Sequence, residues 1–173
     1  KQLEKCQVDY FDFYLFHNVC EMNIDAYLDR SHGIYDYLMK QKENGRIRHL
    51  GFSAHGNYDV MKRFLDAYGE GMEFCQIQLN YLDWTFQDAK SKVELLKEYH
   101  LPVWVMEPVR GGALANLPPQ AAESFAGMDG SPAGYALRFA ASFAGVGMVL
   151  SGMSDPAQME ENLGLFRDFR ALS

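Results

Sequence analysis

The sequence has few cysteines, and their arrangement suits neither a disulfide framework nor a metal site. There are three, Cys6, Cys20 and Cys75, at long and irregular spacings, and no CxxC pair occurs. No cluster of histidines, cysteines and carboxylates has the spacing of metal ligands, so we expect no metal. Reduced thiols are typical of the cytoplasm, which is the localisation we expect.

Long apolar runs and an excess of positive charge are also absent. The apolar runs are interrupted well before they reach the length of a membrane span, and no signal peptide is recognisable, so we expect no membrane partner. The formal net charge is -7 and no basic stripe occurs, which argues against nucleic-acid binding. With 48% hydrophobic residues, the composition is that of a globular domain with a sizeable core.

What the sequence does contain is a repeated pattern of an apolar run followed by a helical pattern. Strands that alternate with helices in this way predict a parallel sheet with crossover connections. We predict strands over residues 8–17, 49–53, 74–81, 102–109 and 147–153. We predict helices over residues 24–44, 58–68, 90–100 and 132–143, and a last one that opens at Asp155-Pro156.

Several local signals support these boundaries. Gly45 is placed to cap the first long helix at its C-terminus, Pro132 fits a first helical turn, and Asp155 fits an N-cap. Residues 117–131 hold two prolines and two glycines and are interpreted as a long connection rather than a domain linker. Residues 1–5 resemble the last turns of a helix already under way, so Lys1 is not expected to be a natural start.

The pattern alone leaves two architectures open, a doubly wound open sheet and part of an eight-stranded barrel. No GxGxxG follows the first run, so the dinucleotide fingerprint of a doubly wound sheet is missing. Gly111-Gly112 follows the fourth run but lacks the lysine and hydroxyl of a phosphate-binding P-loop.

Ligands of parallel α/β folds bind at the carboxyl ends of the strands, and this rule selects a few side chains here. His17 ends the first run and could donate a hydrogen bond to a carbonyl oxygen that becomes negative. Ser53, Gln78 and Asn80 could bind an amide-bearing ring, although taken singly such residues more often satisfy buried backbone at strand ends. Glu107 and Arg110, taken singly, are more readily explained as an ion pair than as catalysts.

Five segments then resemble the aldo-keto reductase family, in the family's order and over nearly the whole chain. They are residues 9–17 (DYFDFYLFH), which resemble the segment ending in the active-site histidine, 45–53 (GRIRHLGFS), similar to "GKIRxIGVS", 78–81 (QLNY), 106–112 (MEPVRGG), similar to "SPLxxG", and 151–162, which resemble the last strand and the adenine-contacting helix.

The resemblance implies an α/β fold, a (β/α)8 TIM barrel of which this chain covers about the last five β/α units. The family's catalytic tyrosine, aspartate and lysine lie on the first three strands. They have no counterpart here, so residues 1–173 are expected to form a partial barrel domain without its N-terminal strands. Of the family's four catalytic residues, only His17 is carried over.

The resemblance also implies a cofactor, NADP or NAD, and the residues that would bind it. Ser53 and Gln78 would hold the nicotinamide carboxamide, while Glu161 and Asn162 would contact the adenine. The full set of expected cofactor-binding residues is Ser53, Gln78, Met106, Pro108, Arg110, Gly111, Ser151, Gly152, Gln158, Glu161 and Asn162.

The sequence departs from the family's pattern at several of these positions. Ala54 replaces a common asparagine, and Met106 replaces the aromatic residue that usually stacks on the nicotinamide. Gly152 and Gln158 stand where many NADPH-dependent members have a lysine and an arginine, which weakens the case for NADPH. The wording around Ser53 and Glu107 resembles a subgroup with a C-terminal iron-sulfur extension, whose cysteines this chain does not contain.

We therefore expect part of an NAD(P)-dependent oxidoreductase that transfers hydride between nicotinamide and a small carbonyl or alcohol substrate. The identity of the substrate does not follow from the sequence. The alternative is a non-catalytic nucleotide-sensing or interaction protein on the same scaffold. The chain alone is expected to be inactive and to self-associate through exposed barrel edges.

Overall fold

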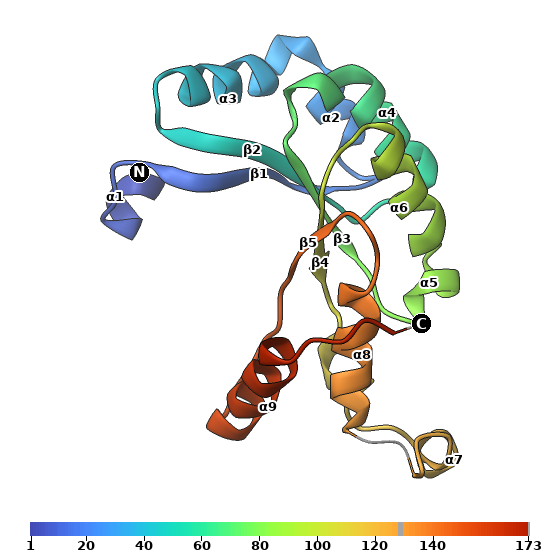
Figure 1. The fold of residues 1–173 in the computed structure, drawn as a ribbon. Helices are drawn as coiled ribbons and strands as arrows, with labels where there is room; N and C mark the ends of the chain where they lie inside the picture. The colour runs from blue at the N-terminus through green and yellow to red at the C-terminus, as the bar shows by residue number, and fades with distance from the viewer. Residues whose placement is uncertain (128–129, 173) are drawn as a thin grey trace. The chain divides into compact units, whose positions relative to one another are not determined.

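The computed structural model describes residues 1–127 and 130–172 of the chain (Figure 1). Contacts divide it into two compact units, unit 1 (residues 1–77 and 90–103) and unit 2 (residues 78–89 and 104–173). The elements in chain order are α1 (Gln2–Cys6), β1 (Phe11–Val19), α2 (Ile24–Leu28), η1 (Arg30–His32), α3 (Ile34–Glu43), β2 (Ile47–Ala54), α4 (Tyr58–Tyr68), η2 (Gly69–Gly71), β3 (Phe74–Gln78), α5 (Asp83–Phe86), α6 (Ala89–Glu98), β4 (Val103–Met106), η3 (Arg110–Gly112), α7 (Pro119–Glu123), α8 (Pro132–Ala141), β5 (Val146–Val149) and α9 (Pro156–Arg167).

The strands follow the chain in the hydrogen-bonded order β1-β2-β3-β4-β5, as the repeated pattern predicts. In unit 1, β1 pairs with β2 and β2 pairs with β3, both in parallel. The approach of β2 to β3 requires a glycine, because a Cβ on Gly51 would lie 2.5 Å from the Phe74 carbonyl oxygen. In unit 2, the Leu150 N–H donates to the Val105 carbonyl over 2.9 Å.

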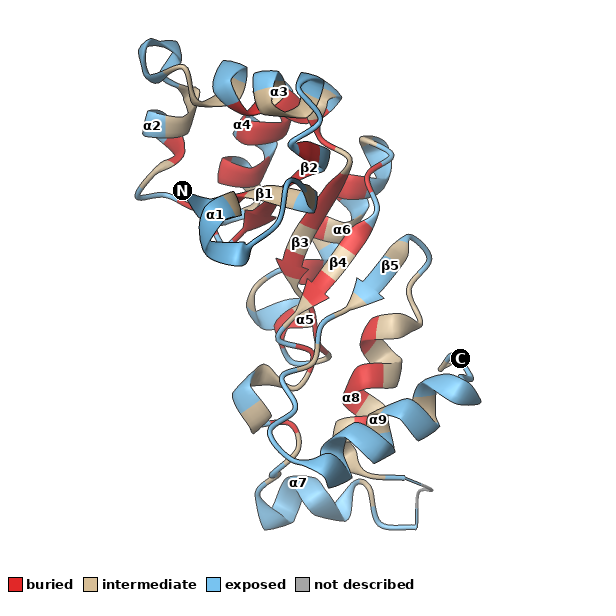
Figure 2. Cartoon of the chain, turned by 90° about the vertical axis from the view of Figure 1, so that its left-hand side faces the viewer, coloured by how far each residue is buried: buried red, intermediate tan, exposed pale blue. Residues whose placement is uncertain are grey.

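The core of unit 1 lies where helix α4 packs its apolar residues. Asn57 caps this helix by accepting a hydrogen bond from the Val60 N–H over 3.0 Å. Apolar residues then recur at steps of three and four, so that one side of the helix is buried (Figure 2). Phe64 is at the centre, with its ring centroid 4.6 Å from Phe52 and 5.2 Å from Phe16. The buried residues of this helix are Val60, Met61, Phe64, Leu65 and Tyr68.

The single helix predicted over residues 24–44 is wrong, because the structure divides this segment into α2, η1 and α3. Helix α2 ends at Asp29, whose backbone is extended and whose side chain accepts a hydrogen bond from the Ser31 N–H. Gly33 has a left-handed backbone with a φ of 59°, which an α-helix does not continue through. Gly45, with a φ of 72°, follows Asn44 at the end of α3, as its predicted capping role requires.

Unit 2 is built around helix α8. Pro132 occupies the first turn, as predicted, and the Ser131 hydroxyl oxygen accepts a hydrogen bond from the Gly134 N–H over 2.9 Å. The helix buries Gly134, Ala136, Leu137 and Ala140. The ring of Phe139 on this helix and that of Phe143 just beyond it contact Trp84, at centroid distances of 6.1 Å and 4.5 Å.

The remaining boundaries agree with the predictions to within a few residues. Helix α4 runs from Tyr58 to Tyr68 as predicted, and Asp155 caps α9 by accepting a hydrogen bond from the Gln158 N–H over 2.9 Å. The predicted third and fourth strands are shorter in the structure, where β3 ends at Gln78 and β4 at Met106. The predicted connection over residues 117–131 contains the short helix α7, and residues 128–129 of it lie outside the described residues.

Candidate functional site

In unit 1, the carboxyl end of β1 presents His17 as an exposed side chain. Its ring lies edge-on to His55, with a centroid distance of 6.4 Å. The His17 backbone is held in place, since its carbonyl oxygen accepts a hydrogen bond from the Tyr27 hydroxyl over 2.8 Å. An accessible imidazole on an anchored backbone is suited to contact a substrate.

The turn that follows His17 is fixed by side chains that bond to the backbone. Asn18 has a left-handed φ of 59°, and its N–H donates to the Ser53 hydroxyl oxygen over 2.8 Å. Asn23 closes the turn, because its side-chain amide donates to the Asn18 carbonyl over 2.7 Å and its oxygen accepts from the Cys20 N–H over 2.9 Å. Ser53 and Asn23 thus hold the backbone of the residue that follows His17, and in this way they help to position His17.

Ser53 is nearly inaccessible, with 1% of its surface exposed. The bond from Asn18 uses a lone pair of its oxygen and leaves its O–H to donate elsewhere. Ser53 lies in register with Gln76 on β3, and alternation along the strand puts Gln76 on the same face as Gln78. The sequence patterns do not single out Gln76, and the period of two between the glutamines is the signal that could have found it.

Burial lowers the pKa of His55 below its usual value, and the charges of His17 and Lys92 act in the same direction. The neutral form of His55 is favoured, which lets it accept a hydrogen bond.

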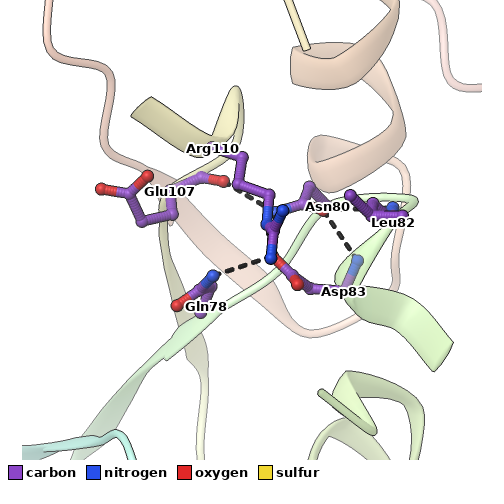
Figure 3. Close-up of polar contacts among 6 residues, drawn as sticks. All are labelled: Gln78, Asn80, Leu82, Asp83, Glu107 and Arg110. Atoms are coloured by element: carbon purple, nitrogen blue, oxygen red, sulfur yellow. Dashed lines mark hydrogen bonds and ion pairs between the residues drawn. The ribbon is translucent and has the colours of Figure 1, made fainter. Parts of the chain in front are cut away.

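In unit 2, three side chains converge on one carboxylate oxygen of Asp83 (Figure 3). Gln78 donates to it from its amide nitrogen over 2.8 Å, and Asn80 does so over 2.6 Å. The Arg110 Nε lies 3.3 Å from the same oxygen. Asp83 is fully buried, so its charge has to be balanced by these donors.

Asn80 makes further hydrogen bonds in this cluster, whereas the second carboxylate oxygen of Asp83 makes none that the structure describes. Asn80 also donates to the Glu107 carbonyl oxygen over 2.9 Å, and its side-chain oxygen accepts from the Asp83 N–H over 2.8 Å. The other Asp83 carboxylate oxygen, Oδ1, is buried without a hydrogen-bond partner among the described residues. Because Arg110 pairs with Asp83, the predicted ion pair between Arg110 and Glu107 is wrong, and the two residues are joined instead by the Arg110 N–H, which donates to the Glu107 carbonyl oxygen over 3.1 Å.

A cavity of about 710 Å³ lies in unit 2, between the turn after β4 and helix α9. This volume is typical of a site for a small molecule or cofactor. Eight of the residues predicted to bind a cofactor line it: Met106, Pro108, Gly111, Ser151, Gly152, Gln158, Glu161 and Asn162. Of the others, Gln78 and Arg110 belong to the Asp83 cluster of this unit, and Ser53 belongs to unit 1.

The turn on one side of this cavity has an unusual backbone. Glu107 and Arg110 have left-handed φ values of 55° and 49°, and Gly111 and Gly112 follow with 60° and 89°. Left-handed residues other than glycine are rare and cluster at functional sites. The two glycines also let a ligand approach the backbone closely.

The opposite side of the cavity is formed by polar side chains that hold one another. The Asn162 amide donates to the Ser151 hydroxyl over 3.1 Å. The Ser131 hydroxyl donates to the Glu161 carboxylate, and the Ser154 N–H donates to the Gln158 side-chain oxygen over 2.8 Å. Amide and carboxylate groups of this kind can bind the edge of a purine base, so the lining fits a nucleotide.

Two other kinds of site find no support within residues 1–127 and 130–172. No group of three or more histidines, cysteines, aspartates or glutamates there could hold a metal ion. No helix in the same part of the chain is both long enough and apolar enough to cross a membrane.

Comparison with known proteins identifies several similar to this chain. A model of the aldo/keto reductase family matches residues 1–173. Comparison with the curated proteins finds no match. Among solved structures, the apo form of an aldo-keto reductase from Bacillus halodurans has a TM-score of 0.79 and 22% identity, over 99% of this chain and 61% of that one.

Two further structures agree with this result. An aldo/keto reductase from Brucella melitensis has a TM-score of 0.71 and 23% identity, over 99% of this chain and 60% of its own. One from Klebsiella pneumoniae, in complex with NADP and acetate, has a TM-score of 0.67 and 18% identity, over 99% of this chain and 58% of its own. The chain thus spans about three fifths of each structure, and the similarity confirms the predicted barrel fold.

Proposed function

Because the chain belongs to the aldo/keto reductase family, we propose that it is part of an NAD(P)-dependent oxidoreductase acting on a small carbonyl or alcohol substrate. The observation that carries the proposal is the cavity of unit 2, where eight residues assigned to the cofactor from the sequence lie together. When bound, a nicotinamide nucleotide supplies or accepts the hydride.

Each residue has a proposed task in this reaction. His17 donates a hydrogen bond that orients the substrate carbonyl and stabilises charge on its oxygen. Ser53 and Gln78 hold the carboxamide of the nicotinamide, and Met106 packs on its ring. On the far side of the cavity, Glu161 and Asn162 contact the adenine, in support of which both line it beside Ser151 and Gln158.

The Asp83 cluster bears on the choice between the two glutamines. The amide nitrogen of Gln78 donates to Asp83, so its oxygen is the atom left to accept from a carboxamide N–H. Gln76, in register with Ser53, is the second candidate for this task. Substituting each by alanine would separate them, since the residue that contacts the nicotinamide should raise the Kd of the nucleotide by about tenfold and the other should not.

The proton donor of the proposed reaction is not among the residues described here. We propose that residues 1–173 alone do not turn over substrate, because the family's tyrosine, aspartate and lysine have no counterpart among them. We also propose that these residues, taken alone, associate through apolar side chains exposed on β1 and β5 and next to the ends of these strands. These include Tyr10 and Phe13 in unit 1 and Met148 and Leu150 in unit 2.

Turnover by the full-length protein tests the proposed reaction. Oxidation of NADH and NADPH would be followed with a panel of aldehydes and ketones. Replacing His17 by alanine should lower kcat by about 100-fold or more, whereas replacing the exposed His32 should not. Tight nucleotide binding without turnover on any carbonyl would instead favour the nucleotide-sensing alternative.

The remaining proposals concern the location of the protein. The three cysteines are free, with Cys20 and Cys75 buried, which supports the proposal of a reducing, cytoplasmic compartment. Fractionation of cells that express the tagged full-length protein would test this, and recovery outside the cytoplasm would contradict it. Membership of the subgroup with an iron-sulfur extension stays a prediction.

A further inference from the structure

The charged residues that line the cavity of unit 2 are acidic, whereas Arg110 in the adjoining turn pairs with Asp83. Two carboxylates line the cavity, those of Glu107 and Glu161, and no lysine, arginine or histidine lines it within residues 1–127 and 130–172. A ligand with additional negative charge would meet repulsion from these groups without a cationic side chain to offset it.

The N-terminus of helix α9 would ordinarily favour an anion at this wall, since its free N–H groups point outward. Here Pro156 has no N–H, and the Gln158 N–H is taken by the protein itself. The Asp155 carboxylate accepts from the Gln158 N–H over 2.9 Å, and the Gln158 side chain accepts from the Ser154 N–H over 2.8 Å. At this helix start the Gln158 N–H is therefore already bonded to a carboxylate, and the Asp155 charge disfavours an added anion.

The N-terminus of helix α8 is occupied in the same manner. The Ser131 hydroxyl oxygen accepts from the Gly134 N–H, and its proton is donated to the Glu161 carboxylate. Ser131 and Glu161 both line the cavity, so a second negative charge sits beside the second helix start. Both helix N-termini on this cavity are capped by side chains and have a carboxylate next to them.

We infer that this cavity selects the nicotinamide nucleotide without a 2′-phosphate, NAD(H), over NADP(H). The inference rests on the proposed function, because it concerns which nucleotide the proposed pocket takes. The two nucleotides share every group except one phosphomonoester, which carries close to two negative charges at neutral pH. The carboxylates of the wall repel that group, so the preference follows from this repulsion and from the lack of cationic partners in the described lining.

Binding to the full-length protein, measured by fluorescence titration with NADH and NADPH, tests the inference without any substrate. We expect NADH to bind at least about tenfold more tightly, with a gap that narrows as salt is added. Equal affinity, or tighter binding of NADPH, would overturn the inference while leaving the proposed function intact. If neither nucleotide bound, the proposed function itself would fail.

A charge added at Gly152 sharpens the test. Gly152 lines the cavity, an added Cβ would meet nothing within 4 Å, and its backbone is not left-handed, so a lysine can be placed there. Gly152→Lys should tighten NADPH binding about tenfold more than NADH binding. Gly164→Lys is the matched control, because Gly164 has equally open surroundings on α9 but does not line the cavity.

Removing a charge is the complementary change. Glu161→Gln keeps an oxygen that can accept from the Ser131 hydroxyl while it removes a carboxylate from the wall. The ratio of the NADPH Kd to the NADH Kd should fall a few-fold, and it should not fall for Glu160→Gln, an exposed neighbour outside the lining. If Gly152→Lys and Glu161→Gln left this ratio at its starting value, the electrostatic argument would be overturned.

Discussion

Helix α4 of unit 1 and helix α9 of unit 2 have nearly the same length, 11 and 12 residues, but opposite relations to their surroundings. Each begins with a capping side chain that accepts a hydrogen bond from the backbone N–H three residues later. The cap is Asn57 in α4 and Asp155 in α9. Helix α4 then buries five residues, whereas α9 has no buried residue. The same kind of N-cap thus begins two helices, one of which packs in a core while the other does not.

The difference separates residues that hold the fold from residues that remain available to a ligand. The side chains of α4 fill the core of unit 1 and contact aromatic rings on β1 and β2. In α9, Gln158, Glu161 and Asn162 line the cavity, and Leu163 has 58% of its surface exposed. A helix that contributes little to a core can vary its side chains with the ligand at small cost to stability.

The largest expected effect comes from emptying the core under α4. Phe64→Ala should lower the free energy of unfolding by about 3–5 kcal/mol, because it removes a fully buried ring that contacts four aromatic neighbours. Leu163→Ala in α9 should cost less than about 0.5 kcal/mol. Urea unfolding of both variants measures the contrast, and similar losses would show that the two helices do not differ as described.

Changing the Asp83 cluster of unit 2 should have an intermediate effect on the free energy of unfolding. Asp83→Asn removes the buried charge that Gln78, Asn80 and Arg110 share, and should cost about 1–3 kcal/mol in unfolding free energy. The exposed Asp168→Asn should be nearly neutral. If Asp83→Asn also left the free energy of unfolding unchanged, the Asp83 cluster would not contribute to the stability of unit 2.

The smallest effect concerns pH and the end of β1 in unit 1. Because burial lowers the pKa of His55 in the folded protein, the unfolded chain binds its proton more readily. Stability should therefore fall as the pH decreases below about 6.5, through the folded pKa, and be constant above that range. Because His55 is only partly buried, solvent screening limits the change in unfolding free energy to about 0.5 kcal/mol or less. His55→Gln should flatten this part of a pH series of unfolding curves, and an unchanged slope would exclude His55 as its source.

Local signals in the sequence predict the elements well where one residue decides the backbone. Asp155 and Pro132 give the starts of α9 and α8, and Gly45 follows the end of α3. The helix predicted over residues 24–44 fails because Asp29 and Gly33 form a turn within the apolar spacing that predicts it. A short polar turn inside an apolar pattern is hard to recognise without tertiary contacts.

The candidate site shows the same limit. The cavity residues could be named because five segments of the sequence resemble the aldo-keto reductases, and the pattern places these segments at strand ends and at a helix start. The partner of Arg110 could not be named, because Asp83 lies in the short helix α5 and meets Arg110 only through the fold. The spacing of Gln76 and Gln78 could have suggested Gln76, but its pairing with Ser53 depends on strand register. The role of Asn23 depends on a left-handed turn, which composition and spacing do not reveal.

Amide hydrogen exchange of the full-length protein, with and without saturating NADH, tests most directly whether the cavity of unit 2 binds the nucleotide. The account predicts slower exchange over residues 106–116 and 151–162, which hold most of the cavity lining, and no change over α4, whose core contacts are already formed. Unchanged exchange in both cavity segments, under conditions where NADH is bound, would contradict it.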